Sequence, residues 1–322
     1  MDRPLRALAA DRGLAVGAAV APGPLVSDPD YAATLRREFG LVTTENALKM
    51  ARLRPSRHAF DFADADAIVG FAREHDMAVR GHTLLWHRSV PDWLAPREHT
   101  DRQLRDLVRR HVHTTVARYR GRVGAWDVVN EAVADDGSLR ETAWSRIADG
   151  PRYLDRAFEW AREADPDAAL FYNDYGAEGL GAKSDAVHDL VSGMLDRGVP
   201  IDGVGLQCHA LGDRPDPEDV AANVERLRDL GLSVHVTELD VAFPRDDPPT
   251  DPGAAQAEYY RDLVGAALEA GAGAVVTWGV DDAHSWVRYY EDFPERYTTD
   301  PLLFDEGYEP KPAYDAVCEA LR

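Results

Sequence analysis

The sequence has little cysteine and no long hydrophobic run. Two cysteines, Cys208 and Cys318, among 322 residues cannot build a disulfide framework, and we expect both to be free thiols. No stretch approaches the roughly 18 consecutive apolar residues of a membrane-spanning helix, so we expect no membrane partner. The N-terminal segment MDRPLRALAADRGLAVGAAV lacks the apolar core of a secretory signal. The protein therefore either stays inside the cell or has a signal that lies outside this numbering.

Positive charge is also scarce, and lysine is scarcer still. The chain has 36 basic and 57 acidic side chains, which give a net charge of −21. A field of this sign repels phosphate backbones, so we expect no nucleic-acid partner. The only lysines are Lys49, Lys183 and Lys311. We expect a compact ammonium to be needed at position 49, where the planar fork of arginine would not fit. Lys311 is expected to be structural and Lys183 to lie on the surface.

Apolar residues are plentiful at 45% of the chain, which is ample for a large core and excludes global disorder. Short apolar or β-branched runs alternate with longer stretches of helical spacing. The eight predicted strands are 14–20, 41–45, 78–84, 125–131, 169–174, 203–209, 233–240 and 274–280. The predicted helices are 28–39, 61–75, 100–118, 151–164, 182–197, 217–230, 252–270 and 312–321. Asp28 or Ser27 can cap the first of these helices, which we expect to stop at Gly40.

This alternation predicts the fold class. Buried strands that are each followed by a helix are parallel strands with crossover connections. Eight such units predict a single (β/α)8 TIM barrel, whose usual size is about 250 residues, with the excess in the loops that follow the strands. No linker or low-complexity block divides the chain, so we expect one domain over residues 1–322. A doubly wound open sheet is the main structural alternative.

Barrels of this kind place their functional residues at the carboxyl ends of the strands. The residues at the ends of strands two to eight are Glu45, Asn46, His82, Trp86, Asn130, Glu131, Asn173, Asp174, Tyr175, Gln207, His209, Glu238, Asp240 and Trp278. Carboxylates, amides and tryptophans suit a carbohydrate, which offers hydroxyls and apolar C–H faces. Hydrolysis of a glycosidic bond needs two carboxyl groups. Glu131 and Glu238 end the fourth and seventh strands, so they can face each other across a bound sugar ring.

Two other classes of protein would show different sequence features. A metal-dependent hydrolase needs ligands at strand ends, where only His82 and His209 qualify, and the pair His111 and His113 lies in a predicted helix and points to different faces. We therefore expect no metal and no cofactor. A non-catalytic sugar-binding protein would need the tryptophans and amides but not two facing carboxylates.

Several stretches closely resemble the xylanases of glycoside hydrolase family 10. They are GHTLLWH (81–87), WDVVNEA (126–132), YNDY (172–175), GLQCH (205–209), VTELD (236–240), TWGVDD (277–282), LLFD (302–305) and KPAY (311–314). The resemblance covers essentially the whole chain. It implies a retaining (β/α)8 endo-β-1,4-xylanase that cuts xylan or xylo-oligosaccharides by double displacement, as one catalytic domain with no separate carbohydrate-binding module.

The resemblance also implies roles for individual residues. Glu131 matches the acid/base and Glu238 the nucleophile, while His209 and Asp240 match the hydrogen-bonded support of the nucleophile. Asn130 should bind the 2-hydroxyl of the attacked sugar, and Gln207 should orient the catalytic carboxylates. The residues implied to bind sugars are Glu45, Asn46 and Lys49 on the glycone side, His82, Trp86, Trp278 and Trp286 as walls of the glycone pocket, and Tyr175 on the leaving-group side. The remaining tryptophans, Trp93, Trp126, Trp144 and Trp160, are expected to pack in the core.

Two positions depart from the family pattern. Ser89 stands where family members commonly have a glutamine that helps to bind the distal sugar, and Gly176 stands where NDYN has an asparagine. Both changes remove contacts to substrate and neither touches Glu131 or Glu238. Activity restricted to short xylo-oligosaccharides or cellobiosides therefore stays open as an alternative. We expect the two catalytic carboxyl groups about 5–5.5 Å apart, the retaining spacing, and the protein to be a monomer.

Overall fold

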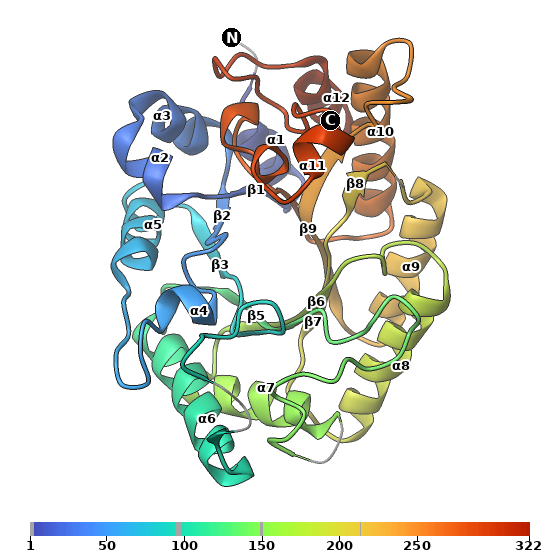
Figure 1. Ribbon diagram of the computed structural model, residues 1–322. Coiled ribbons are helices and arrows are strands. Elements are labelled where there is room, and N and C mark those ends of the chain that lie inside the picture. Colours follow the sequence, from blue (N-terminus) through green and yellow to red (C-terminus); the bar gives the residue numbers. More distant parts are fainter. Residues whose placement is uncertain (1–2, 95–97, 149–150, 213) are drawn as a thin grey trace.

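In the computed structural model, eight parallel strands close into a barrel with helices around it (Figure 1). Residues 3–94, 98–148, 151–212 and 214–322 are described. The barrel strands are β1 (Ala15–Ala19), β2 (Leu41–Thr43), β3 (Ala78–Gly81), β5 (Ala125–Asn130), β6 (Ala169–Asp174), β7 (Gly203–Leu206), β9 (Ser233–Ala242) and β10 (Ala274–Thr277). They pair in that order, and β10 pairs with both β9 and β1. The prediction of a (β/α)8 barrel is confirmed, and the open-sheet alternative is wrong.

Two short strands extend this barrel at the rim. β4 (Leu85–Trp86) pairs with β5, and β8 (His209–Leu211) pairs with β9. The predicted strands 78–84 and 203–209 each ran past the end of a barrel strand, so these segments continue as loops and short pairings. That irregular backbone begins where the functional residues begin.

The eight predicted helices are all present, each within two residues of its predicted ends. They are α3 (Pro29–Glu38), α5 (Ala63–Glu74), α6 (Asp101–Arg118), α7 (Arg152–Ala164), α8 (Ala182–Asp196), α9 (Pro217–Asp229), α10 (Pro252–Glu269) and α12 (Pro312–Ala320). The sequence did not predict six shorter elements. They are α1 (Leu5–Asp11), α2 (Pro22–Ser27), α4 (Met50–Leu53), α11 (Phe293–Arg296) and the 3-10 turns η2 (Asp282–His284) and η3 (Trp286–Arg288). Segments this short show too little of a 3.6-residue period to be recognised in a sequence.

The start of α3 shows how local chemistry sets helix boundaries. Asp28 caps it, because its Oδ1 accepts hydrogen bonds from the backbone N–H groups of Asp30 and Tyr31 at 2.9 and 3.2 Å. Ser27 belongs to α2 instead. The helix ends at Glu38 with Phe39 as its C-cap, so its expected stop at Gly40 is confirmed. Gly40 does not cap it in a left-handed conformation, and its N–H donates to the carbonyl of Val16. Gly40 therefore leads the chain into the barrel.

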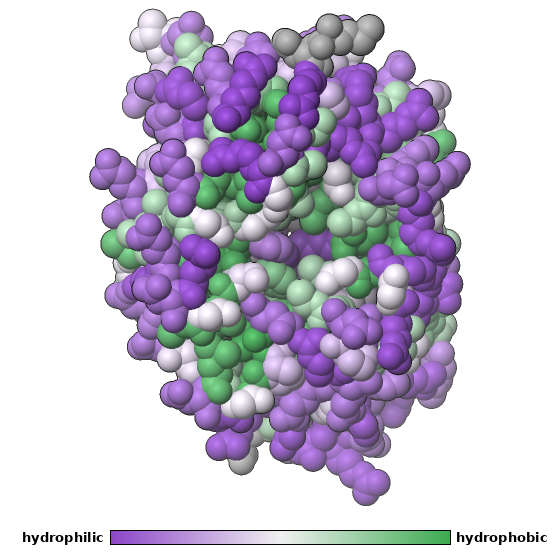
Figure 2. All heavy atoms as spheres, turned by 180° about the vertical axis from the view of Figure 1, so that it is seen from behind, coloured by the Kyte–Doolittle hydropathy of each residue, from purple (hydrophilic) through white to green (hydrophobic). Residues whose placement is uncertain are grey.

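The surface and the core divide as expected for a water-exposed barrel. Hydrophilic residues cover most of the face seen in Figure 2, and apolar residues gather around its hollowed centre. Both cysteines are buried and free, as predicted. Among the described residues, no helix is long and apolar enough to cross a membrane.

Candidate active site

A cavity of about 1270 Å³ opens at the carboxyl ends of the strands. It brings together thirteen of the fourteen residues predicted for the site. These are Glu45, Asn46, Lys49, His82, Trp86, Asn130, Glu131, Tyr175, Gln207, His209, Glu238, Trp278 and Trp286. The fourteenth, Asp240, is fully buried directly behind His209. The loops that follow separate strands therefore converge on one pocket, as the barrel geometry requires.

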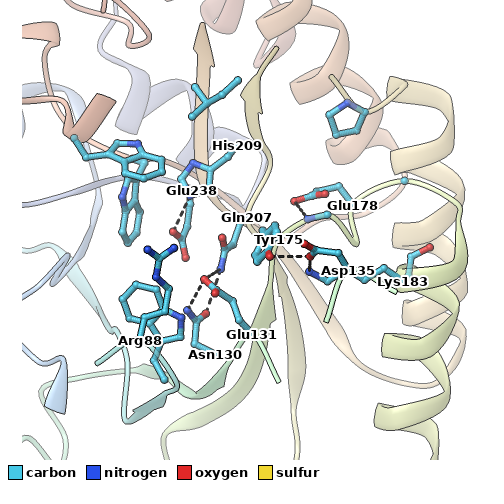
Figure 3. Close-up of a pocket in the computed structure, with 18 of the residues that line it drawn as sticks. Arg88, Asn130, Glu131, Asp135, Tyr175, Glu178, Lys183, Gln207, His209 and Glu238 are labelled. Atoms are coloured by element: carbon cyan, nitrogen blue, oxygen red, sulfur yellow. Dashed lines mark hydrogen bonds and ion pairs between the residues drawn. The ribbon is translucent and has the colours of Figure 1, made fainter. Parts of the chain in front are cut away.

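Glu238, in β9, is buried and held by two partners, of which Figure 3 shows His209. His209 Nε2 lies 3.1 Å from its Oε2, and Asn173 Nδ2 donates to its Oε1 at 2.7 Å. The other nitrogen of His209, Nδ1, lies 2.9 Å from Asp240 Oδ1. Carboxylate, imidazole and carboxylate thus form the chain that the sequence predicted.

The electrostatics of this chain favour an ionised Glu238. Burial opposes the charge on the imidazolium of His209, but Asp240 and Glu238 outweigh it and raise the pKa of His209 to about 10. Burial likewise opposes ionisation of Glu238, yet His82, His209 and Lys49 together hold its pKa below the ordinary value. The carboxylate is therefore charged and oriented before any substrate arrives.

Glu131 lies directly after β5 with a left-handed backbone, φ 57°. Its N–H donates to the carbonyl of Asn173 at 2.8 Å. Asn130 Nδ2 and Gln207 Nε2 donate to its Oε1 at 3.1 and 3.2 Å. Amide groups thus hold Glu131, whereas a histidine and an amide hold Glu238.

Asn173, in β6, was among the residues at the strand ends, but no role in the site was predicted for it. Its Nδ2 donates both to Glu238 and to Asn130 Oδ1, the latter at 2.8 Å, while its Oδ1 accepts from Thr237. One side-chain amide therefore links the two halves of the site. Its place at a strand end, next to Asp174, was the signal that could have found it.

A polar layer inside the barrel supports the pocket from below. Arg80 and Asp127 form an ion pair with about 1% of each side chain exposed, and Arg80 Nε donates to Asp127 Oδ2 at 3.0 Å. The same Asp127 oxygen lies 2.9 Å from His82 Nδ1. The imidazole of His82 then meets the Trp278 ring edge-on, with centroids 5.2 Å apart. Neither Arg80 nor Asp127 was predicted, because both lie inside strands where apolar residues are usual.

On the predicted glycone side, three polar residues form a hydrogen-bonded row. Lys49 Nζ donates to Asn46 Oδ1 at 2.9 Å, and Asn46 Nδ2 donates to Glu45 Oε1 at 2.8 Å. The ammonium lies 4.6 Å from the centroid of the Trp86 ring and 5.7 Å from that of Trp278. Burial lowers the pKa of Lys49, although nearby carboxylates offset part of that effect.

On the opposite side of Glu131, Tyr175 and Lys183 form the wall (Figure 3). Lys183 Nζ lies 3.5 Å from the centroid of the Tyr175 ring and 3.2 Å from both Asp135 and Asp174. Only 6% of the lysine is exposed, so its predicted surface position is wrong. Gly176 beside it has a left-handed backbone, φ 64°, which favours glycine, and a Cβ there would make only an ordinary contact of 3.7 Å with the ammonium. The scarcity of lysine was the signal that could have placed Lys183 in the pocket.

The second departure from the family pattern also has a structural counterpart. Ser89 does not line the cavity; its Oγ accepts from the N–H of Ala51 at 3.1 Å and so supports the start of α4. The neighbouring Arg88 lines the cavity instead, and its Nη2 lies 2.8 Å from Glu291 Oε1. The sequence reasoning missed Arg88 and Glu291.

The other tryptophans follow the predictions with one addition. Trp126, Trp144 and Trp160 are buried, and Trp93 is partly buried against the core. Trp286 lines the cavity as expected, and in addition its Nε1 donates to Asp240 Oδ2 at 2.6 Å. Within the described ranges, no group of three or more histidine, cysteine, aspartate or glutamate side chains could hold a metal ion.

A closed parallel barrel with two buried glutamates at the ends of its fourth and seventh strands, in a pocket walled by amides and tryptophans, is the arrangement of a glycoside hydrolase. The chain belongs to glycosyl hydrolase family 10, whose model matches residues 4–320.

Three similar proteins illustrate this membership. The endo-1,4-beta-xylanase B of Thermotoga neapolitana is 40% identical over 325 residues, which cover 99% of this chain and 92% of that protein. The crystal structure of native xylanase 10B from Thermotoga maritima superposes with a TM-score of 0.92 at 39% identity, covering 99% of this chain and 98% of that one. Xylanase 10B from Thermotoga petrophila RKU-1, solved with xylobiose, gives a TM-score of 0.94 at 38% identity, covering 100% and 98%.

Proposed function

We infer that the protein is a retaining endo-1,4-β-xylanase, with Glu238 as nucleophile and Glu131 as acid/base. The observation that carries the assignment of roles is the difference between their environments. Glu238 is held by a histidine of raised pKa that favours the ionised form, whereas Glu131 is held by neutral amides. Similar proteins bear the name endo-1,4-beta-xylanase, and one was solved with xylobiose.

In the first step, a carboxylate oxygen of Glu238 attacks the anomeric carbon of the sugar bound in the glycone pocket. Protonated Glu131 gives its proton to the glycosidic oxygen, the C–O bond breaks, and the leaving sugar departs as an alcohol. The Glu238 ester and the Glu131 carboxylate remain. Asn173 and His209 hold the attacking carboxylate at its place, so little of the reaction barrier is spent on orienting it.

In the second step, the Glu131 carboxylate takes a proton from a water molecule, whose oxygen attacks the same carbon. The ester bond breaks, Glu238 returns to its ionised form and Glu131 is protonated again. Two inversions at one carbon give net retention, so the first-formed product is the β-anomer.

We assign the sugar contacts by position in the pocket. Glu45, Asn46 and Lys49 would bind glycone hydroxyls, and Asn130 would bind the 2-hydroxyl of the attacked sugar. Trp86, Trp278, Trp286 and His82 would wall the glycone pocket, and Tyr175 would stack on the leaving-group sugar. We further propose that residues 1–322 act as one catalytic domain, because the family model spans residues 4–320. A hydrogen bond from Arg12 to the carbonyl of Ala320 joins the first and last parts of the chain.

The test is release of reducing sugar from xylan and from xylobiose through xylohexaose by the wild-type chain and by Glu238→Ala. We expect release by the wild type, its loss in Glu238→Ala, and the β-anomer first in proton NMR. Glu163→Ala, an exposed position on α7, is the matched control and should keep full activity. An initial α-anomer would contradict the double displacement.

A further inference from the structure

An ion pair joins two loops that line the pocket. Arg88, in the loop after β4, places its Nη2 2.8 Å from Oε1 of Glu291, which lies between η3 and α11. Both residues line the cavity. Their positions in the chain are 203 residues apart, so the contact depends entirely on how the two loops fold.

The strand order shows what this contact crosses. Arg88 belongs to the connection between β3 and β5, and Glu291 follows β10. β1 and β2 lie between β10 and β3 in the barrel. Both residues line the cavity, and the sector of the barrel between them carries Glu45, Asn46 and Lys49 after β2.

The ion pair is also attached to the glycone wall. The Arg88 guanidinium lies 5.3 Å from the centroid of the Tyr290 ring, and that ring lies 5.1 Å from Trp286. In Figure 3, Arg88 lies to one side of Glu131, and Tyr175 and Lys183 lie to the other. The ion pair therefore lies on the side of the pocket that holds Trp286, away from Tyr175 and Lys183.

We propose that the Arg88–Glu291 bridge roofs the glycone end of the pocket and sets the chain-length preference of the enzyme, favouring short xylo-oligosaccharides over polymeric xylan. This rests on the proposed function. A polymer cut in its interior continues beyond the pocket on both sides, so it enters only when the bridge opens. A short oligosaccharide can be held beneath a closed bridge.

The size of the effect follows from the exposure of the pair. The Arg88 and Glu291 side chains are 49% and 59% exposed. Ion pairs this open to water are weak and screened by salt, so opening the bridge costs the polymer at most about a fivefold factor in kcat/KM. The bridge therefore biases the enzyme against polymer without blocking it.

The experiment compares kcat/KM on arabinoxylan, a neutral soluble polymer, with kcat/KM on xylotriose. In Glu291→Gln and Arg88→Gln we expect the polymer-to-trimer ratio to rise by about three- to fivefold. The double variant Arg88→Glu/Glu291→Arg exchanges the two charges and so restores an ion pair. It should bring the polymer-to-trimer ratio back toward that of the wild type. An unchanged ratio in both single variants would overturn the proposal.

The chain offers a matched control. Arg109 on α6 and Glu163 on α7 form an ion pair of 3.1 Å with 56% and 52% exposure, away from the cavity. Arg109→Gln should leave the ratio unchanged. A rise in this variant equal to that in Arg88→Gln would show that loss of any surface ion pair moves the ratio, and would sink the proposal.

A salt titration tests the bridge in the wild-type chain, without any variant that has to fold. Raising sodium chloride from about 20 mM to about 500 mM screens the ion pair, so the ratio should rise in the wild type and stay level in Glu291→Gln. A ratio that does not respond to salt in the wild type contradicts the bridge. If the wild type released no reducing sugar from either substrate, the proposed function itself would fail.

Discussion

At the scale of single residues, Glu131 and Glu238 share one pocket but have different partners. Two amides donate to the same oxygen of Glu131, and a histidine and an amide hold Glu238. Neutral amides tolerate both protonation states of a carboxyl group, as an acid/base must. A cationic partner such as protonated His209 favours the ionised form of Glu238, which is the form that a nucleophile needs.

This difference predicts the behaviour of Glu131→Gln. Without its proton donor, kcat/KM on xylan should fall by about 10²- to 10⁴-fold. A dinitrophenyl xylobioside, whose leaving group needs no proton, should lose far less in the first step, measured as the burst of dinitrophenolate. Equal losses on both substrates would rule out the acid role.

The pKa of His209 predicts a pH-dependent contribution to stability. That pKa is about 10 in the folded chain, against about 6.5 for an ordinary histidine. A raised pKa stabilises the folded state fully below about pH 6.5, and the gain is lost as pH rises toward about 10. The difference in Tm between the wild type and His209→Gln should therefore shrink from pH 6 to pH 10 in thermal melts. A constant difference would show that His209 is neutral.

At the scale of elements, polar groups between strands hold the pocket. The ion pair of Arg80 in β3 with Asp127 in β5 lies inside the barrel, directly beneath His82. Gly205 of β7 leaves the space that Arg80 and Asn173 occupy. A Cβ at this position would lie 3.0 Å from Arg80 Nη2 and 2.1 Å from Asn173 Oδ1, so a larger residue would not fit. The strands therefore supply a polar layer where a barrel usually has only apolar side chains.

Breaking this buried pair should be costly. Asp127→Asn leaves the Arg80 charge buried without its counter-charge, which should lower the free energy of unfolding by about 3–5 kcal/mol. Glu163→Gln, which breaks the exposed pair with Arg109, should cost less than about 1 kcal/mol. Denaturant unfolding at pH 7 measures both, and equal losses would contradict the importance of burial.

At the scale of the whole molecule, the net charge of −21 is the dominant electrostatic feature. Self-repulsion of like charges destabilises a compact chain and is screened by salt. The Tm should therefore rise between about 20 mM and 500 mM sodium chloride. Differential scanning fluorimetry measures it, and a Tm that falls with salt would show that attractive ion pairs outweigh the repulsion.

The order of residues in the chain was enough to predict the barrel and most of the pocket. Strand and helix periods are local properties of a segment, and parallel closure carries every strand end to one rim. Glu131 and Glu238 could therefore be placed in one pocket from their positions in two runs, together with other strand-end residues that line it, whereas Lys49 and Trp286 were expected there from the family resemblance.

Which of these groups contact one another follows from the folded arrangement and not from the order of residues in the chain. In the folded chain Lys183 lies in the pocket wall, and Asn173 forms hydrogen bonds with both Asn130 and Glu238. Trp286 donates a hydrogen bond to Asp240, and Arg88 forms an ion pair with Glu291. The last two contacts join residues 46 and 203 positions apart through irregular loops. No periodic pattern encodes such contacts, because they depend on loop conformations that form only when the whole rim is assembled.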